Sequence, residues 1–507
     1  MKITYLFLLI KVVSFVKCAK ILAVFPSPGY SQFIMGEKLM EELVRRGHEV
    51  TVISAFKPTK DIKNYTLILV DGLHETLTGD LYLQEDANPF KSILYLEELG
   101  QLITEHTLAH EKVQQLIHSN ETFDLVFVEI LVNEAHMGFA AHFKAPLVSF
   151  CSIGFSEWDA QFVGNVRLPS VSPLSLSSYT ERMTFVQRLH NALLNWFHAI
   201  YKEVVSYPHQ QKLLTKYFPG NLNLKDVIYN VSIMLQNSHA STTFPSTLTT
   251  NVIEIGGFHI TNKELPSDIK KYLDEATEGA IFFSMGTNLK SADLPKHKLD
   301  GILKAFSKLK QRVLWKFERM DIPNKPENVF ISKWMPQTDI LAHPNIVAFI
   351  THGGLLSTTE AIYYGVPMIG IPVFVDQKMN VARSVEKQIA VHLPLKELSE
   401  ESLSEALKQI LTNQRYSKNA KELSNVFNDQ MAKPLDVAVF WMEYVIRHGG
   451  APHLRNAAIE LYWFQLYLLD VIAFIIICIV TFCYAAKLLV RRLISNVPLR
   501  NRKQKIN

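Results

Sequence analysis

A buried strand that ends in two glycines and runs directly into a helix constrains this chain more than any other feature. Ile346 to Ile350 form an apolar run, Thr351-His352-Gly353-Gly354 follow, and helical spacing begins near Ser357. The glycines let the backbone approach a ligand closely, and the start of the helix offers unpaired N–H groups at the positive end of its dipole. This junction therefore predicts a site for a phosphate or diphosphate group.

Polar residues around the junction extend the prediction to a sugar nucleotide. Ser357 and Thr358 add hydroxyls, and Glu360, one turn further, is placed to accept hydrogen bonds from ribose. Asp376 and Gln377 follow the next strand, and open α/β sheets bind ligands at the carboxyl ends of their strands. The alternative for any one residue is an ordinary strand–helix crossover with glycines for tight turns, but the whole set at this spacing favours the site.

The stretch from Phe330 to Asn380 resembles the signature of the UDP-glycosyltransferases, the family that includes the UDP-glucuronosyltransferases. The matching pieces are W-x-P-Q at Trp334 to Gln337, H-x-G with a downstream S-T-x-E at His352 to Glu360, and the D-Q pair. The resemblance extends from the N-terminal ILAVFPSPGYS to the C-terminal apolar segment. It implies an α/β protein with two facing Rossmann-like domains, the glycosyltransferase type B fold, and a C-terminal single transmembrane helix.

The resemblance also implies roles at the donor site. The tryptophan of W-x-P-Q stacks on uracil and its glutamine contacts the nucleoside, while the glutamate holds the ribose and the D-Q pair holds the sugar. The histidine, the glycine turn and the helix hydroxyls hold the diphosphate, which the small-residue loop Met285-Gly286-Thr287 also faces. Many members carry Asn where Leu356 stands, so one phosphate hydrogen bond is missing. The expected donor-binding residues are Ser284, Gly286, Trp334, Gln337, His352, Gly353, Gly354, Ser357, Thr358, Glu360, Asp376 and Gln377.

The implied reaction is displacement at the anomeric carbon with inversion and departure of UDP, which requires a base for the acceptor hydroxyl. No D-x-D occurs in the sequence, so we expect no metal and no cofactor, with the UDP-sugar as co-substrate. The family's catalytic His follows P-x-x-S in the first loop, where this chain has Gln32 after Pro28 to Ser31. The Asp that usually orients this His is replaced by Glu129.

An amide cannot take a proton at neutral pH, so Gln32 can only orient the acceptor. Three outcomes stay open. Glu129 acts as the base, directly or through a water; the enzyme favours acceptors that ionise readily, such as acidic phenols, carboxylic acids or thiols; or the protein has little activity and serves as a partner subunit. His136 and His142 lie near the sheet edge, but their spacing does not single them out as substitutes.

Hydrophobic periodicity predicts two successive sets of alternating strands and helices, which indicates parallel sheets. No G-x-G-x-x-G follows the first strand, which disfavours a nicotinamide or flavin site. An insertion rich in Ser, Pro and aromatic residues, Ser152 to Gly220, suits a pocket for a hydrophobic acceptor, the alternative being plain core. The predicted strands are 20–26, 49–54, 65–71, 123–129, 146–150, 231–237, 279–284, 312–316 and 346–350, with a helix over 32–46 and an interdomain crossing over 251–259.

At 507 residues the chain is too long for one core. The first residues have a lysine near the start, an apolar middle and small residues at the end, which is typical of a secretory signal peptide. The predicted segments are a signal peptide (1–19), an N-terminal acceptor-binding domain (20–250), a C-terminal UDP-sugar-binding domain (251–450), a juxtamembrane segment (451–466), a transmembrane helix (467–487) and a cytosolic basic tail (488–507).

The stretch from Lys487 onward carries seven basic residues and no acidic one, so the positive-inside rule places the tail in the cytosol and the body of the chain in the lumen. Lys503 and Lys505 resemble a lysine-based retrieval signal, the alternative being a generic basic tail. We therefore expect a single-pass type I protein of the endoplasmic reticulum membrane. Removing the seven basic residues from Lys487 onward and the three of the leader turns the net charge of +4 into −6, which argues against a nucleic-acid partner.

Of four cysteines only Cys151 lies in the predicted folded body, which excludes an intramolecular disulfide there. Three Asn-x-Ser/Thr sequons, at Asn64, Asn120 and Asn230, are available for glycosylation in the lumen.

These observations predict a membrane-bound UDP-glycosyltransferase that transfers a hexose from a UDP-sugar to small lipophilic acceptors. The sequence HGGLLSTTEA is similar to that of invertebrate members of the family, which favours UDP-glucose over UDP-glucuronate as the donor. The alternative from another class is a catalytically weak or silent UDP-sugar-binding partner subunit, motivated by Gln32. A single-pass binding protein with no nucleotide site would require the signature to be a coincidence. Whether the chain forms a homo- or hetero-oligomer stays open.

Overall fold

The computed structural model describes residues 18–73, 85, 87–154 and 158–495. The chain forms two compact units, one ending at Arg455 and the other beginning at Asn456. The predicted signal peptide, apart from its last two residues, and the retrieval lysines of the tail lie outside the described residues.

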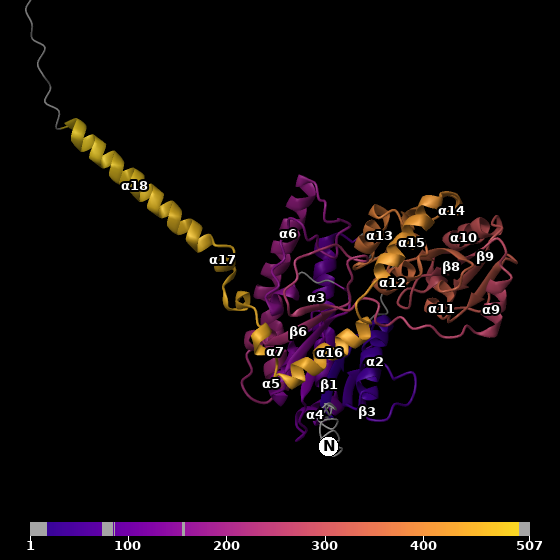
Figure 1. Cartoon of the computed structure of the whole chain (residues 1–507), viewed down its shortest axis with the longest axis horizontal. Helices are drawn as coiled ribbons and strands as arrows, with labels where there is room; N and C mark the ends of the chain where they lie inside the picture. The colour runs from indigo at the N-terminus through magenta and orange to yellow at the C-terminus, as the bar shows by residue number, and fades with distance from the viewer. Residues whose placement is uncertain (1–17, 74–84, 86, 155–157, 496–507) are drawn as a thin grey trace, which may run out of the picture. The chain divides into compact units, whose positions relative to one another are not determined.

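Seven parallel strands form the first sheet, in the order β3-β2-β1-β4-β5-β6-β7 (Figure 1). The first six lie close to where periodicity predicted them. The prediction that Val252–Glu254 belongs to the interdomain crossing was wrong, because these residues pair with β6 and extend the sheet. The strands are β1 Lys20–Phe25, β2 Glu49–Ser54, β3 Tyr65–Leu69, β4 Leu125–Glu129, β5 Leu147–Cys151, β6 Val231–Gln236 and β7 Val252–Glu254.

Helices cover both faces of this sheet because its strands are apolar on both sides. Leu22 and Val24 of β1 lie in one buried cluster, whereas Ile21 and Ala23 lie in another. The helices that accompany the first sheet are α2 Tyr30–Arg45, α3 Pro89–Ala109, α4 Glu111–Ile117, α5 Gly138–Phe143, α6 Phe185–Tyr201, α7 Tyr207–Tyr217, α8 Leu224–Ile228 and α16 Pro434–Arg447.

The last of these helices, α16, comes from the far end of the first unit and returns to the first sheet. Val439 and Met442 are buried in the same cluster as Ile21 and Ala23. The resemblance implies this return, and it ties the end of the second set of elements to the core of the first.

Six parallel strands form the second sheet, in the order β10-β9-β8-β11-β12-β13. The helix predicted near Ser357 begins earlier, at Leu355, because Gly354 takes an extended conformation and caps it. The strands are β8 Ala280–Ser284, β9 Arg312–Lys316, β10 Val329–Ser332, β11 Ile346–Thr351, β12 Met368–Gly370 and β13 Ala390–His392. The helices are α9 Ser267–Asp274, α10 Lys296–Ser307, α11 Gln337–Leu341, α12 Leu355–Tyr364, α13 Gln377–Glu386, α14 Glu400–Thr412 and α15 Gln414–Asn428. The structure therefore has two α/β domains, each with a parallel sheet, and this confirms the predicted fold class.

The inserted segment between β5 and β6 contains α6 and α7, joined by one turn of π-helix over Lys202–Ser206. Lys202 is buried, and its ammonium pairs with Glu134 and, at 3.5 Å, with Glu97. His198 contacts the Glu97 carboxylate at 2.6 Å. Burial alone would raise the pKa of Glu97, but Lys202 and His198 hold it below its usual value. The charges persist in the interior because each has a partner.

The second unit contains α17 Trp463–Leu466 and α18 Leu469–Ser495. The 27 residues of α18 include an apolar window with a mean hydropathy of 2.5. At about 1.5 Å per residue the helix is about 40 Å long, enough to cross a hydrocarbon core of about 30 Å. It is the one candidate membrane span in the described part of the chain, and it overlaps the predicted segment 467–487.

The buried ion cluster should contribute strongly to stability. We expect Lys202→Met to lower the free energy of unfolding by about 3–5 kcal/mol, because it leaves two buried carboxylates without their cation. Urea unfolding followed by tryptophan fluorescence measures the change. The matched control is Lys225→Met, which breaks an exposed pair with Glu203 and should cost less than about 1 kcal/mol. Equal unfolding midpoints for both variants and the parent would contradict the expectation.

Candidate active site

The carboxyl ends of three neighbouring strands meet at one edge of the second sheet. β8 ends at Ser284, β9 at Lys316 and β11 at Thr351, and Ser284 and Thr351 are register partners. The Gly286 N–H donates to Ser284 Oγ at 3.2 Å, and the Gly353 N–H donates to Thr351 Oγ1 at the same distance. The two hydroxyls therefore hold both glycine loops at the edge where parallel sheets bind ligands.

The imidazole of His352 packs closely against two glycines. A Cβ on Gly286 would come within 2.5 Å of His352 Cε1, and a Cβ on Gly354 within 2.5 Å of Nε2. Gly286 also has a φ of +83°, in the left-handed region that favours glycine. The glycines predicted to give a ligand room also seat this ring.

His352 is neutral at physiological pH. Burial and the positive charge of Lys316 lower the pKa of its imidazole to about 4. Its Nδ1 is buried and has no hydrogen-bond partner among the described residues. A neutral imidazole has one N–H donor, so the ring is suited to donate a hydrogen bond to a phosphate oxygen.

Lys316 is a residue that the sequence analysis missed. Its Nζ donates to the Gly286 carbonyl at 2.7 Å and pairs with Glu318 at 3.1 Å. It therefore fixes the loop after β8 and brings a positive charge to the edge where His352 lies. In the sequence, Lys316 is a single lysine at the end of an apolar strand. That pattern alone does not distinguish a lysine that binds a neighbouring loop from one that extends into solvent.

Glu360 is buried and held by polar neighbours. Gln337 Nε2 donates to its Oε2 at 2.6 Å, and the Thr338 hydroxyl donates to its Oε1 at 3.1 Å. Gln337 also donates to Ser357 Oγ at 2.9 Å. The structure thus brings the W-x-P-Q and S-T-x-E motifs together. Gln337 and Glu360 could bind one nucleoside, as predicted, only if they lay this close to each other. His259 Nε2, 3.4 Å from Glu360 Oε1, comes from the segment between the two domains and was not predicted.

Asp376 and Gln377 lie at the start of α13, against the glycine turn. Asn380 Nδ2 donates to the Asp376 carboxylate at 2.7 Å and to the Gly353 carbonyl at 3.1 Å. Gln377 Oε1 accepts from two backbone N–H groups of the preceding loop. Burial raises the pKa of Asp376 to about 6, although the Asn380 hydrogen bond opposes the shift. Asn380 connects the D-Q pair to the turn, a contact that sequence spacing did not indicate.

Trp334 is 55% exposed, whereas the other predicted donor residues are buried or partly buried. An open indole face is what stacking on a base requires. Its ring meets Tyr30 edge-on, with the centroids 5.9 Å apart. Tyr30 is the first residue of α2, so the start of the helix that carries Gln32 contacts the predicted base-stacking residue.

Leu356 replaces the family's Asn with an apolar contact. Its side chain is partly buried against the core cluster that contains β1 and α16. The neighbouring Leu355 lies so close to Gly154 that a Cβ there would come within 2.6 Å of Leu355 Cδ2. The start of α12 is therefore packed against the first domain.

Gln32 and Glu129 come together with Ser152, which was not predicted. Gln32 Oε1 accepts from the Ser27 hydroxyl, and its Nε2 donates to Ser152 Oγ at 3.1 Å. Glu129 is 1% exposed, and its Oε1 has no hydrogen-bond partner in the part of the chain that the structure describes. Burial raises the pKa of Glu129 to about 7, although the Ser152 and Gln32 side chains oppose the shift. Such a carboxyl has the properties of a general base at neutral pH.

The other histidines near the sheet edge have core roles. His136 Nδ1 contacts Asn133 at 2.9 Å, and burial lowers the pKa of this histidine to about 3. His142 bonds the Ile117 carbonyl at 2.7 Å.

The expectation that the aromatic residues of the insertion line an acceptor pocket fails for Phe185 and Trp196. Their side chains are 70% and 61% exposed, because they lie on the outer face of α6. Trp158 and Phe162 are buried, as plain core residues would be.

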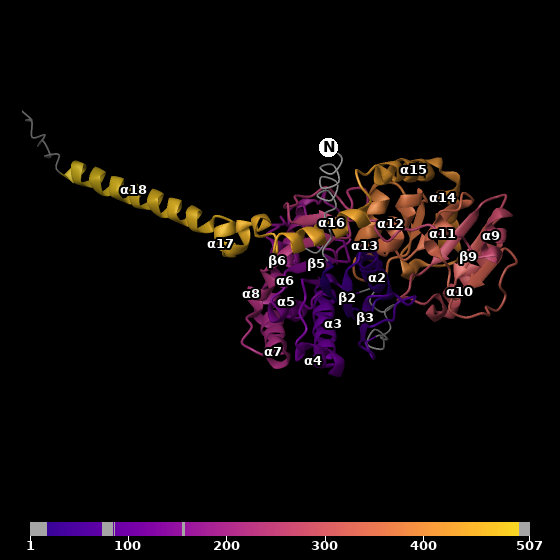
Figure 2. The same cartoon turned by 60° about the horizontal axis from the view of Figure 1, so that its bottom comes forward.

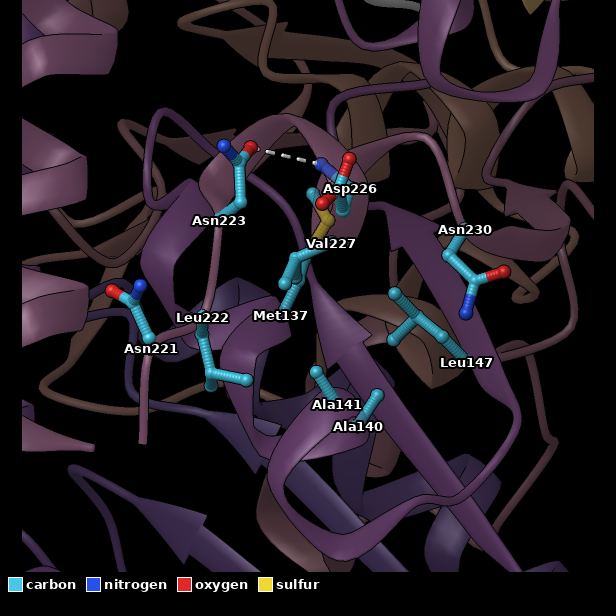
Figure 3. A pocket seen from close by; sticks show the side chains of 10 residues that line it. All are labelled: Met137, Ala140, Ala141, Leu147, Asn221, Leu222, Asn223, Asp226, Val227 and Asn230. Carbon is cyan, nitrogen blue, oxygen red and sulfur yellow. Dashed lines mark hydrogen bonds between the residues drawn. The ribbon is translucent and has the colours of Figure 1, made fainter. Parts of the chain in front are cut away.

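A cavity of about 190 Å³ lies at the opposite edge of the first sheet, where Leu147 begins β5 and Asn230 precedes β6 (Figure 3). One wall is α8, capped by the Asn223 side chain, which accepts a hydrogen bond from the Asp226 N–H at 3.3 Å. Its volume is below the roughly 300–1,000 Å³ of typical ligand sites, and it lies away from Glu129. The three sequon asparagines, including Asn230, are exposed.

Similarity to known proteins agrees with this geometry. The family model described as "UDP-glucoronosyl and UDP-glucosyl transferase" matches residues 19–497. UDP-glucosyltransferase 2 of Dactylopius coccus is 34% identical over 498 residues, covering 96% of each chain. UDP-glucuronosyltransferase 2B15 of Rattus norvegicus is 31% identical over 492 residues, covering 91% of each chain.

Solved structures share the fold at low sequence identity. The glycosyltransferase VinC in complex with dTDP superposes with a TM-score of 0.59 at 18% identity, covering 85% of this chain and 100% of VinC. A UDP-glucosyltransferase from Polygonum tinctorium gives the same TM-score at 15% identity, covering 85% of this chain and 99% of that one. The fold is thus the two-domain type B glycosyltransferase fold, as predicted. With the family model spanning nearly the whole chain, the protein belongs to the UDP-glucuronosyl and UDP-glucosyl transferase family and is a UDP-glycosyltransferase.

Proposed function

We propose that this UDP-glycosyltransferase transfers a hexose, preferably glucose, from a UDP-sugar to small lipophilic acceptors with inversion and without a metal ion. The observation that carries the proposal is the close packing of the neutral His352 ring against Gly286, after β8, and Gly354, at the start of α12. Glucose is favoured because the Dactylopius coccus relative is named a glucosyltransferase and is 34% identical, against 31% for the rat glucuronosyltransferase 2B15.

The donor side of the reaction rests on hydrogen bonds and charge at the diphosphate. The N–H groups at the start of α12, the His352 ring and the Lys316 ammonium all lie at one edge of the second sheet. They stabilise the negative charge that develops on the diphosphate as the bond between the anomeric carbon and the UDP oxygen breaks. Trp334 and Glu360 hold the uracil and the ribose, and Asp376 and Gln377 hold the sugar.

The acceptor side uses Glu129 as the base. The acceptor oxygen attacks the anomeric carbon, its proton moves to the Glu129 carboxylate, and the electron pair of the broken bond leaves with UDP. The raised pKa of about 7 makes Glu129 a stronger base than an exposed carboxylate. Gln32, held by Ser27 and Ser152, orients the acceptor instead of deprotonating it.

The apolar helix α18 and the basic residues that follow it support a single-pass anchor. We propose a type I orientation in the endoplasmic reticulum membrane, with the transferase body in the lumen. The silent-subunit alternative is not supported, because the named relatives reported above are transferases over nearly the full chain.

Loss of the His352 ring should remove donor use. We expect His352→Ala to lower kcat/KM for UDP-glucose by about 10²–10³-fold, the effect of deleting one preorganised donor. Turnover in membranes carrying the variant measures this, and exposed His297→Ala serves as the control. Turnover like that of the wild type in His352→Ala would overturn the site assignment.

The pH profile should report the base. The carboxylate form of Glu129 is the active one, so kcat/KM with a weakly acidic phenol should rise with pH through about 7 and then level off. Glu129→Gln should lower the plateau by about 10²–10⁴-fold and remove this limb of the profile. A variant that keeps the same profile at the same rate would mean that another group takes the proton.

An imidazole at position 32 should add a second base. We expect Gln32→His to raise turnover of weakly acidic phenols by up to about 10²-fold, and of strongly acidic ones much less, because only the former need a base. A panel of phenols of graded acidity measures the difference. A uniform gain or loss across the panel would point to altered acceptor binding instead.

A further inference from the structure

The helix α6 is amphipathic with its faces reversed. The residues that point into the protein include Asn191, His198 and, in the π-turn that follows, Lys202, all at most 4% exposed. The opposite face is apolar and open to solvent. This outward stripe consists of Phe185, Val186, Leu189, Leu193, Trp196 and Ile200, which are between 46% and 71% exposed.

The reversal is fixed by the buried partners of the polar face. His198 and Lys202 contact Glu97 of α3, and Lys202 also pairs with Glu134, in the turn before α5. The Asn191 side chain donates hydrogen bonds to the carbonyls of Pro169 and Ser172. Rotating the helix to bury the stripe would break these contacts and leave charges unpaired in the interior. The stripe is therefore held outward by the structure itself.

The loop that packs against the inward face of α6 also exposes apolar residues. Leu168 and Val171, on the loop that Asn191 holds, are 51% and 53% exposed. The helix Phe185–Tyr201 contains no acidic residue, whereas Arg188 and His190 flank the stripe. An apolar face of aliphatic and aromatic residues with basic flanks is the composition of helices that lie in a membrane interface.

We propose that α6 docks on the lipid surface, with the outward stripe in the interface between headgroups and acyl chains. This inference rests on the proposed membrane anchor. Only thirteen residues separate Arg455 from the start of α18, so the first unit stays within at most about 45 Å of the bilayer that α18 would cross. In both views, α6 and the C-terminal end of α16 lie on the same side of the first unit (Figures 1 and 2).

Depth-dependent fluorescence quenching tests the proposal on the full chain. Exposed cysteines are replaced by alanine, and an environment-sensitive fluorophore is attached at Leu193→Cys or at Lys418→Cys, an exposed position on α15. The protein is reconstituted in phosphatidylcholine–phosphatidylserine vesicles that contain acyl-chain nitroxide lipid. A helix in the interface lies about 5–10 Å into the headgroup boundary, so we expect roughly two- to fivefold stronger quenching at Leu193 than at Lys418.

Two further arms separate the outcomes. In a separate chain that keeps Cys478 of α18 while the other exposed cysteines are replaced by alanine, a fluorophore on Cys478 reports anchoring. If that probe is not quenched, the proposed anchor fails, and with it the lipid docking. If Cys478 is quenched and Leu193 is quenched no more than Lys418, the docking alone is overturned. An oxidative disulfide between two Leu193→Cys chains would make a second copy the occupant and would also overturn it.

A charge-bearing variant makes the result specific to the stripe. Leu193→Glu with Ile200→Glu should reduce the quenching of a probe at Val204→Cys to the level of the Lys418 control. Lys408→Glu with Lys418→Glu, which adds acidic residues elsewhere, should leave quenching at Val204 unchanged. None of these readouts requires turnover, so a chain inactive as a transferase can still pass or fail them.

Discussion

The donor site depends on how closely two backbone loops approach one imidazole ring. Gly286 and Gly354 both approach the Cε1–Nε2 edge of the His352 ring so closely that no side chain fits at either position. Gly354 also caps α12, so the same residue that makes room for the ring sets where the helix N–H groups begin. Gly354 therefore determines both the position of the His352 ring and the start of α12. A ligand that binds the imidazole and the helix N–H groups meets both at the same edge of the sheet.

Lys316 illustrates how the electrostatics follow from that packing. Its ammonium donates to the carbonyl of Gly286, and burial together with this positive charge lowers the pKa of the His352 imidazole. A protonated His352 would repel this lysine in a partly dry site, whereas a neutral one donates a hydrogen bond without that cost. The arrangement thus places the positive charge on a lysine and the directional donor on a histidine.

In the first domain, the residue at the family's catalytic position is Gln32, which cannot act as a base. Where the family's base is an imidazole, this chain has an amide whose two ends are held by Ser27 and Ser152. The carboxyl beside it, Glu129, is buried and its pKa is raised to about 7, which is why we propose it as the base. Burial supplies the change, because a charged carboxylate is disfavoured in the interior and takes a proton more readily.

Local patterns in the sequence predicted the strands and the glycine junction, because strand period and turn chemistry are local properties. Strands β7, β10 and β13 were missed, since they are only three or four residues long and each is defined by pairing with a neighbouring strand. Lys316, His259 and Ser152 were missed for a related reason: each acts through a partner brought near only by the fold. Helix α6 was a different case. From the sequence it was assigned only to the aromatic-rich insertion, as acceptor pocket or plain core, whereas Phe185 and Trp196 are exposed.

What decides the direction of α6 is the charge on other elements. Glu97 and Glu134 are buried by the sheet and by α3, and each needs a cation or a hydrogen-bond donor in reach. The polar face of α6 supplies them, and the free energy of leaving carboxylates unpaired exceeds that of leaving apolar side chains in water. Because the polar face of α6 must pair with these buried carboxylates, its apolar stripe faces outward. In the proposed docking, a lipid surface covers this exposed stripe. Fold stability and membrane contact would thus arise from the same helix orientation.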